Sequence, residues 1–419
     1  MRHHREHLRA DLTAGLTVAV LLVPQAMAYA ALAGMPAQAG LHAAIVSLVV
    51  YAALGSSRLL MMGPAALDAL LVAAVVAPVA GGDAARYVAA ASLLAVLVGL
   101  VQLALALFRL GKLSTVLTAP AMRGFTAGAA LLICATQVPE LLGLDGISPG
   151  SLLLPAVGEI ARSLTGVHLQ TALMGVSALV VLVLLPRRWP SAPAPLIVML
   201  LTTGVVAVLA LDQQGVRVVG EVPAGPPVPV LPNWDAPLLR QLAPGALLIA
   251  FVSWLESSTV ARTYAEESDR LDPRRELWAL GAANAAAGLV RGFPGASGLA
   301  RTAVNHRAGA RTQLSGVIAA LVLLVVVMFL TPLFSPLPRM TLAAVVLLAA
   351  ASLVDLPGTR LLRARPREGA VVFVTLLATA LLGVAPGLAV AVICSLLGRP
   401  GVRAVAQRYT LTISRRSPD

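Results

Sequence analysis

Long apolar stretches separated by short polar loops run through almost the whole chain. The hydrocarbon core of a bilayer is about 30 Å thick and needs roughly 20 apolar residues per straight helix, fewer for a half-helix. On this criterion the pattern predicts fourteen membrane-spanning segments. The first seven cover residues 12–33, 38–54, 63–80, 88–108, 118–138, 169–185 and 195–211. The second seven cover residues 244–264, 275–290, 296–306, 313–334, 339–355, 368–383 and 386–399.

Two of these segments begin at a helix-breaking pair of residues. The third follows Gly63-Pro64, the tenth follows Pro294-Gly295, and both hold the same place in their set of seven. Gly/Pro-interrupted segments at matching positions of two halves indicate a transporter site built from broken helices. We therefore expect an all-α polytopic membrane protein with a seven-plus-seven inverted repeat. Two half-helices would meet at mid-membrane, with a short strand as an option before each.

Composition supports a membrane protein. The chain is 58% hydrophobic and 12% charged, whereas a soluble domain is nearer half apolar and a quarter charged. Cys134 and Cys394 both lie in apolar segments and are interpreted as buried thiols, not as a disulfide or a metal site. An enzyme is not expected, because no nucleophile–base pair or metal-ligand cluster is evident.

The basic residues indicate the topology. With a cytoplasmic N-terminus and fourteen spans, 22 of the 31 Lys and Arg residues fall on the cytoplasmic side, as the positive-inside rule requires. The net charge of +12 is therefore attributed to loops facing anionic lipid rather than to nucleic-acid binding. We expect a multi-pass protein of the cell's inner (plasma) membrane with both termini in the cytoplasm.

Three of the ionisable residues within predicted spans are candidates for a functional site. Glu256 is in the eighth span, Arg301 in the tenth half-helix, and Asp68 in the third. Ionisable groups at membrane depth cost roughly 2.5–3.5 kcal/mol each on insertion scales, so they are functional candidates by default. The helix breaks beside Arg301 and Asp68 also free backbone amides, which membranes tolerate only around a cavity or inside protein.

Four stretches together resemble one family of transporters. They are residues 22–30 (LVPQAMAYA), 63–67 (GPAAL), 256–265 (ESSTVARTYA) and 295–305 (GASGLARTAVN), the last continuing to residue 316. Each motif alone is weak, but as a set they resemble the sulfate permease (SulP) family of anion transporters, which includes prestin. The resemblance covers nearly the whole chain. It implies a fold shared with the uracil permease type, with the substrate between two facing half-helices, and a homodimer.

The chain departs from the family in two ways. The third half-helix has Asp68, where a small or apolar residue is expected. A C-terminal STAS domain, which is usual in the family, is expected to be absent.

The resemblance also implies a division into domains. The expected parts are a cytoplasmic tail (1–11), the first half of a core domain (12–110), the first half of a gate domain (111–211), an extracellular linker (212–243), the second half of the core domain (244–335), the second half of the gate domain (336–399) and a cytoplasmic tail (400–419).

The expected anion site combines a cation with backbone donors. Arg301 would attract an anion near a positive helix terminus, although pairing with Glu256 or a backbone carbonyl for structure alone is the alternative. The other candidate ligands are Ser297 and the amides of Ala296, Ser297 and Gly298, together with the amides of Ala65 and Ala66. Gln25 and Tyr29, which follow Pro24, either line the cavity or pack between helices.

Coupling is assigned to the acids. Glu256 resembles the family's acidic residue in the eighth span, and a carboxyl group in a low-dielectric setting can exchange protons near neutral pH. Asp68 is a second candidate for a protonatable or cation-binding group. No cofactor is expected. The coupling ion is expected to be H⁺, or Na⁺ at a site near Glu256.

The function expected from the resemblance is secondary active transport of a small inorganic or organic anion. Proton-coupled symport of a sulfate, bicarbonate or dicarboxylate ion by an elevator-like motion is the leading hypothesis. Sodium-coupled symport and anion exchange are alternatives, as are a chloride channel or voltage-responsive motor. A nucleobase permease is a further alternative, but that family would place a second acid where this chain has Ser297 and Arg301.

Overall fold

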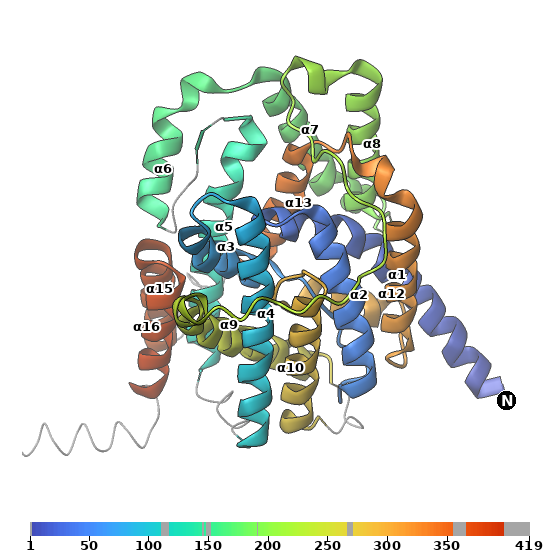
Figure 1. The fold of residues 1–419 in the computed structure, drawn as a ribbon, viewed down its shortest axis with the longest axis vertical. Coiled ribbons are helices and arrows are strands. Elements are labelled where there is room, and N and C mark those ends of the chain that lie inside the picture. Colours follow the sequence, from blue (N-terminus) through green and yellow to red (C-terminus); the bar gives the residue numbers. More distant parts are fainter. Residues whose placement is uncertain are drawn as a thin grey trace, which may run out of the picture.

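Helices make up most of the protein (Figure 1). The computed structural model describes residues 2–109, 117–144, 146–147, 152–190, 192–265, 271–354 and 366–397, with side chains from residue 7 onward. The first half contains α1 (Arg2–Leu32), α2 (Ala37–Leu54), α3 (Ala66–Ala80), α4 (Ala84–Leu107), α5 (Ala119–Leu142), α6 (Leu153–Arg162), α7 (Leu169–Arg188) and α8 (Ala194–Leu209). The second half contains α9 (Ala236–Thr263), α10 (Pro273–Leu289), α11 (Leu299–Arg307), α12 (Leu314–Val325), α13 (Arg339–Leu353), α15 (Pro366–Leu382) and α16 (Val384–Leu397).

Every predicted span coincides with one described helix. Within the described residues, seven helices are long and apolar enough to cross a membrane, and α3, α8, α13 and α16 are shorter apolar helices. The twelfth helix continues through a π-helical turn (Val326–Leu330) and a 3-10 turn (Thr331–Phe334). The prediction of an all-α, multi-pass membrane protein is therefore confirmed.

Several helix bounds differ from the prediction, and one helix was not predicted. Helix α9 begins at Ala236 rather than at 244, because Asp235 and Pro237 open a helical turn that an apolarity criterion does not detect. Helix α6 lies between the fifth and sixth predicted spans and was not predicted. It has ten residues, of which only Ala156 is buried, so it lacks the length and the apolar surface of a span.

The packing of the helices repeats between the two halves. The seven spans of the first half can be matched in order with those of the second. The contact between α4 and α10 then corresponds to the contact between α12 and α2. In the same way α1 contacts α12 as α9 contacts α4, and α3 contacts α9 as α11 contacts α1. The pair α5 and α15 likewise corresponds to α13 and α7. This pairwise correspondence is the arrangement that an inverted repeat produces.

Two very short strands cross at the centre of the fold. Strand β1 (Met62–Gly63) precedes α3, and strand β2 (Ala296–Ser297) precedes α11. They pair in antiparallel fashion, with Met62 opposite Ser297 and Gly63 opposite Ala296. A side chain on Gly295 would fall on the carbonyl of Gly63, so a glycine is required at this crossing.

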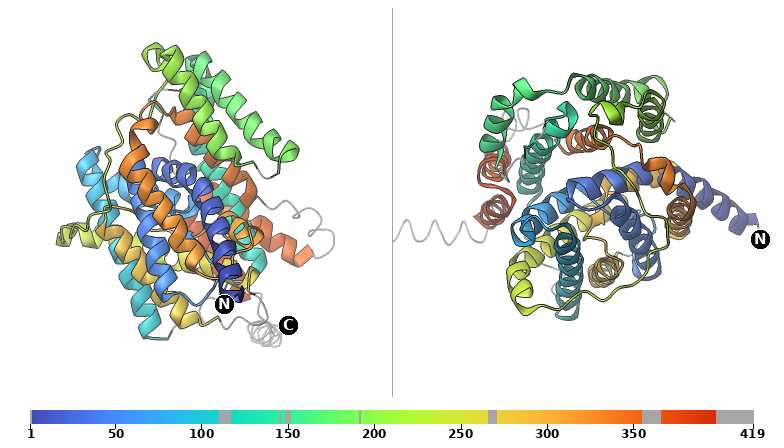
Figure 2. Two further views of the ribbon diagram at one scale, coloured as in Figure 1. Left: turned by 90° about the vertical axis from the view of Figure 1, so that its right-hand side faces the viewer. Right: turned by 45° about the horizontal axis from the view of Figure 1, so that its top comes forward.

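The described helices form two groups. The first helix group contains α1–α4 and α9–α12, and the second contains α5–α8, α13, α15 and α16 (Figure 1 and the right-hand view of Figure 2). Most helix contacts lie within one group. Between the groups, α1 packs on α8 and α13, while α3 packs on α5 and α13.

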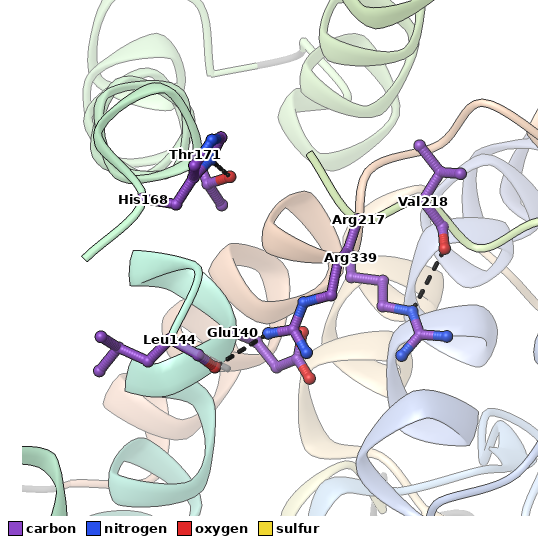
Figure 3. A network of polar contacts seen from close by, with 7 residues as sticks. All are labelled: Glu140, Leu144, His168, Thr171, Arg217, Val218 and Arg339. Atoms are coloured by element: carbon purple, nitrogen blue, oxygen red, sulfur yellow. Dashed lines mark hydrogen bonds and ion pairs between the residues drawn. The ribbon is translucent and has the colours of Figure 1, made fainter. Parts of the chain in front are cut away.

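Residues 212–235, which we call the strap, join the two halves of the chain and run in front of α2 and α4 in Figure 1. The strap pairs with the start of α13 through a single bridge between Val218 and Pro338. Backbone hydrogen bonds there join Arg339 N to Arg217 O (2.9 Å) and Val219 N to Leu337 O (2.8 Å). Figure 3 shows the adjoining side chains, where Arg217 donates to the carbonyl of Leu144 at 3.1 Å.

The strap is also fixed to the first helix group. Gly225 N donates to Val327 O at 3.3 Å, and Val230 N donates to Leu289 O at 2.6 Å. The strap is therefore anchored to the second helix group near Val218 and to the first from Gly225 onward.

Candidate functional site

A cavity of about 210 Å³ lies beside the crossed strands. Helices α1, α3, α9, α11 and α13 all contribute to its wall. It meets a second cavity, of about 580 Å³, which lies between α5 and α9. Leu67, Glu256 and Leu299 line both spaces, as do Ser352 and Leu353 of α13.

The starts of α3 and α11 both face the smaller cavity. The capping residues are Ala65 and Gly298, and neither cap provides a side-chain hydrogen bond. The first amides of a helix have no partner within the helix, and its N-terminus carries a positive partial charge. Two such ends, brought together by the crossed strands, offer backbone donors to an anion without needing particular side chains.

Arg301 is buried at 1% exposure and holds the crossing together. Its Nη1 donates to the carbonyl of Pro64, and its Nη2 donates to those of Gly63 (3.2 Å) and Ala296 (3.1 Å). Its Nε has no hydrogen-bond partner among the described residues. A guanidinium has five N–H groups, so three act in the scaffold and two are not used by it, while Arg301 as a residue lines the cavity.

Gly298 allows Arg301 to lie close to the start of α11. A Cβ atom at residue 298 would come within 2.8 Å of the Arg301 Nε and 3.0 Å of Nη2. Such contacts force a side chain to shift. The absence of a side chain at Gly298 therefore positions the guanidinium directly beside the helix terminus.

Other polar residues of α11 and its surroundings support the chain before β1. Thr302 Oγ1 accepts from Met61 N at 3.3 Å, and Asn305 Nδ2 donates to Leu59 O at 2.9 Å. Gln313 Nε2 donates to Leu60 O at 3.2 Å. These side chains provide hydrogen-bond partners for an extended backbone segment that has little secondary structure of its own. Their roles were not deduced from the sequence.

A second buried network supports the chain before β2. Asn284 Oδ1 accepts from Gly295 N, and its Nδ2 donates to Gln102 Oε1, both at 2.9 Å. Gln102 Nε2 in turn donates to Ser253 Oγ at 2.7 Å. The sequence signal for this network was a polar residue on each of three helices, which does not by itself show that the three meet.

Two predicted ligands lie elsewhere than expected. Ala296 and Ser297 do not line the cavity, and both are fully buried. The Ser297 amide donates to Ser257 Oγ at 3.0 Å, and the Ala296 carbonyl accepts from Arg301. The strand pairing turns these groups toward the scaffold, so the expected amide site is corrected to one that begins at Gly298.

The remaining predicted ligands meet at the cavity. Gln25 and Tyr29 approach it from α1, and Ala65 and Ala66 approach it from the start of α3. Tyr264, Ser352 and Leu353 also line it and were not predicted. Ser352 and Leu353 come from the second helix group, so the cavity lies between the two groups.

Both predicted coupling acids lie near Arg301. Glu256 lines both cavities, and its Oε2 is buried without a hydrogen-bond partner among the described residues. Asp68 is fully buried in the first turn of α3, does not line the cavity, and lacks a partner for either oxygen. Arg301 and the two acids lie close enough to interact electrostatically.

No direct ion pair joins these three residues in the part of the chain that the structure describes. The described residues also contain no cluster of three or more His, Cys, Asp or Glu side chains suited to a metal ion. A sodium ion near Glu256 would therefore depend on hydroxyl and carbonyl oxygens for its remaining ligands.

Comparisons with known proteins agree on one family. Residues 8–375 match the Sulfate permease family. A probable sulfate transporter of Mycobacterium tuberculosis is 41% identical over 397 residues, which cover 94% of this chain and 70% of that protein.

Two solved structures share the fold. SLC26A9 gives a TM-score of 0.87 at 24% identity and covers 94% of this chain, which spans 65% of that structure. The transmembrane domain of BicA, a cyanobacterium bicarbonate transporter, gives a TM-score of 0.80 at 25% identity, covering 93% of this chain and 97% of that domain. This multi-pass membrane chain belongs to the sulfate permease family, a family of transporters and not of enzymes.

Proposed function

We propose that the protein is a secondary active transporter that carries a small anion across the membrane. The observation that supports this most directly is the convergence of two half-helix starts and the unused N–H groups of Arg301 on one cavity. Every donor in this set favours negative charge. The nucleobase alternative is weakened, because Ser297 and Arg301 stand where a second acid would be needed.

The substrate class follows from the size and chemistry of the cavity. A space of about 210 Å³ accommodates sulfate, bicarbonate or a small dicarboxylate. Its donors are backbone amides and a guanidinium, which suit planar and tetrahedral oxyanions alike. The names of the relatives, a probable sulfate transporter and a bicarbonate transporter, lie within this class.

Alternating access would arise from movement of one helix group against the other. The first group would be the core domain and the second the gate domain, with the anion carried by α3 and α11. On one side of the site α1 packs against α13, whereas the matching pair, α9 and α5, is separated by the cavity of about 580 Å³. With the N-terminus in the cytoplasm, this opening faces inward.

Proton coupling would use the charge balance at the site. Two carboxylates beside one guanidinium give a net charge of −1 and would repel an anion, and an unpartnered buried carboxylate is costly. Protonation of Glu256, or of Asp68, removes this repulsion, so a proton and an anion would bind together. Sodium at Glu256 would have the same electrostatic effect, and exchange would need neither ion.

Uptake into proteoliposomes tests the proposal. We expect labelled sulfate, bicarbonate or a dicarboxylate to accumulate when the outside is acidic. If accumulation requires sodium and does not depend on pH, the coupling ion is Na⁺ rather than H⁺. If only downhill exchange of anions is observed, transport is not coupled to a cation. Large anion currents without concentrative uptake would favour the channel or motor.

Cysteine labelling tests the orientation in a cell's plasma membrane. Cysteines at Pro227 and Gly82 should react with an impermeant reagent from outside, and one at Arg274 only from inside. Outside labelling at Arg274 would overturn the fourteen-span topology. Both termini would lie in the cytoplasm, and cross-linking of the purified protein would test the expected homodimer.

A further inference from the structure

A separate cleft of about 720 Å³ lies beneath the strap. Its walls come from the starts of α2 and α4, the end of α10 and the strap residues 226–233. None of its lining residues lines either cavity at the transport site. In the proposed topology this cleft opens to the outside, whereas the transport site opens to the cytoplasm.

The cleft has the composition of a ligand site. Small-molecule sites are concave, occupy about 300–1,000 Å³, and combine a mainly apolar wall with a few polar groups. Val88, Val228 and Val230 provide apolar surface here, and Pro36 and Pro232 add rigid backbone. Hydrogen bonds fix the roof, because Val230 N binds Leu289 O, and His42 Nε2 lies 3.1 Å from Gly225 O.

Arg291 gives the cleft its charge. It lines the cleft at the end of α10, and its side chain is exposed. Among the described residues its guanidinium forms neither a hydrogen bond nor an ion pair. A single exposed cation holds an inorganic anion only weakly in water, so the adjoining apolar wall would have to contribute most of the affinity of a ligand.

The backbone at Arg291 is also unusual. Its φ is +57°, in the left-handed region, which disfavours residues other than glycine by roughly 1–2 kcal/mol. Gly292 follows immediately, yet it is not the residue that adopts this conformation. This conformation closes the end of α10, because Gly292 N donates to Ala287 O at 2.9 Å. Glycine would adopt it more easily than arginine does.

We propose that this cleft binds an amphipathic anion, whose carboxylate or phosphate pairs with Arg291 and whose apolar part lies between the strap and α4. Two sources share this chemistry: a free carboxylate with an alkyl chain, and an anionic phospholipid of the surrounding leaflet. The proposal concerns binding and does not depend on the transport function.

Thermal unfolding of the full-length protein tests the site with decanoate as the free probe and decanol as its neutral counterpart. In a neutral detergent, decanoate below its micelle concentration should raise the unfolding temperature of the wild type with saturation, and decanol should do so with an affinity a few-fold weaker. In Arg291→Gly the apparent Kd for decanoate should rise about two- to fivefold, the loss expected for an exposed ion pair. Glycine suits the left-handed backbone, so this variant should fold at least as well as the wild type.

Arg162→Gln is the matched control, because it removes an exposed arginine from α6, far from the lining of the cleft. It should respond to decanoate as the wild type does. The lipid source is tested in nanodiscs, where phosphatidylglycerol should stabilise the wild type over phosphatidylcholine, and this difference should disappear in Arg291→Gly.

The response of Arg291→Gly decides between the outcomes. Weakening of the decanoate effect alone identifies a free anion, and loss of the phosphatidylglycerol effect alone identifies a lipid. Equal responses in the variant and the wild type would overturn the proposal, as would the absence of any response to either anionic probe in the wild type.

Discussion

The two half-helices that meet at the candidate site share their backbone and differ in their side chains. Both follow a two-residue strand, both begin without a side-chain cap, and the strands pair with each other. Yet α11 presents Arg301, Thr302 and Asn305 to the scaffold, whereas the first turn of α3 contributes only Asp68 as a polar side chain. The repeat thus preserves a pair of positive helix ends, while scaffolding side chains are concentrated in one half.

This difference also separates the charges. Arg301 reinforces the attraction of the α11 terminus for anions, whereas an ionised Asp68 would oppose that of α3. An inverted repeat with identical side chains could not combine strong anion attraction with an acid whose protonation adjusts it. The comparison therefore predicts that substitutions in α11 affect both folding and transport, and that those near α3 affect mainly coupling.

The largest effect is expected for Arg301→Ala. It removes three hydrogen bonds to buried carbonyls as well as the charge at the cavity. Uptake should fall to background, and stability should fall by about 3 kcal/mol or more. The measurements are tracer uptake and thermal unfolding.

Arg307→Ala is the control for that variant. Arg307 is exposed at the end of α11, and its Nε bonds only to a carbonyl of its own helix. It should leave both quantities near their wild-type values. Normal stability of Arg301→Ala would show that the guanidinium is no scaffold, and normal uptake would exclude it from the anion site.

Gly298→Ala gives α11 the capping residue that α3 already has at Ala65. The added Cβ would lie 2.8 Å from Nε of Arg301 and displace the guanidinium. Uptake should therefore fall at least about tenfold, the loss expected for one misplaced hydrogen-bond donor. The reverse change, Ala65→Gly, should alter uptake by less than about twofold, since glycine is tolerated at a cap. Equal effects would mean that the two termini are equivalent after all. Initial rates of uptake at matched protein density are the measurement.

Glu256→Gln separates coupling from binding. Wild-type uptake should accelerate as the outside pH falls and should acidify the vesicle interior. The amide mimics the protonated acid, so the variant should still exchange anion for anion but lose acidification and accumulation. Intravesicular pH during uptake is the readout, and Asp68→Asn is the parallel variant. If Glu256→Gln still acidifies the interior as the wild type does, Asp68 becomes the coupling group.

Asn305→Ala should have the smallest effect. It removes one hydrogen bond to Leu59 O and leaves that carbonyl buried, which should cost about 1–3 kcal/mol of stability. Substrate affinity should change by less than about threefold, because Asn305 does not line the cavity. A large rise in KM with unchanged stability would instead place Asn305 in contact with the substrate.

The sequence was sufficient for most of the fold because membrane spans are long and apolar and because Gly63-Pro64 and Pro294-Gly295 mark the two breaks. It also drew attention to Glu256 and Arg301, which both line the cavity, since ionisable residues are conspicuous in apolar surroundings. The sequence could not show which N–H groups already donate hydrogen bonds within the protein. The Ser297 amide and three N–H groups of Arg301 have partners distant in sequence, and only the crossing of β1 and β2 brings them together.

Sequence patterns also missed features that depend on where loops run. Asn284, Gln102 and Ser253 lie on three different helices, and nothing in the local sequence shows that they form one network. The cleft beneath the strap likewise depends on the backbone path of the strap. Its prolines and glycines are compatible with many such paths, so the sequence does not determine which one is adopted. The left-handed backbone conformation of Arg291 likewise has no signature in the sequence.

The two anchorages of the strap set a limit on travel. It is bonded to the second group at Arg217, through Arg339 N and Leu144 O, and to the first group from Gly225 onward. Fully extended, the eight residue steps between these points reach about 27 Å. The segment therefore acts as a tether: a displacement of one group against the other that stretches it beyond this length must first release hydrogen bonds at one of its ends. The stroke of the transporter would then be set by the length of a loop that touches no substrate.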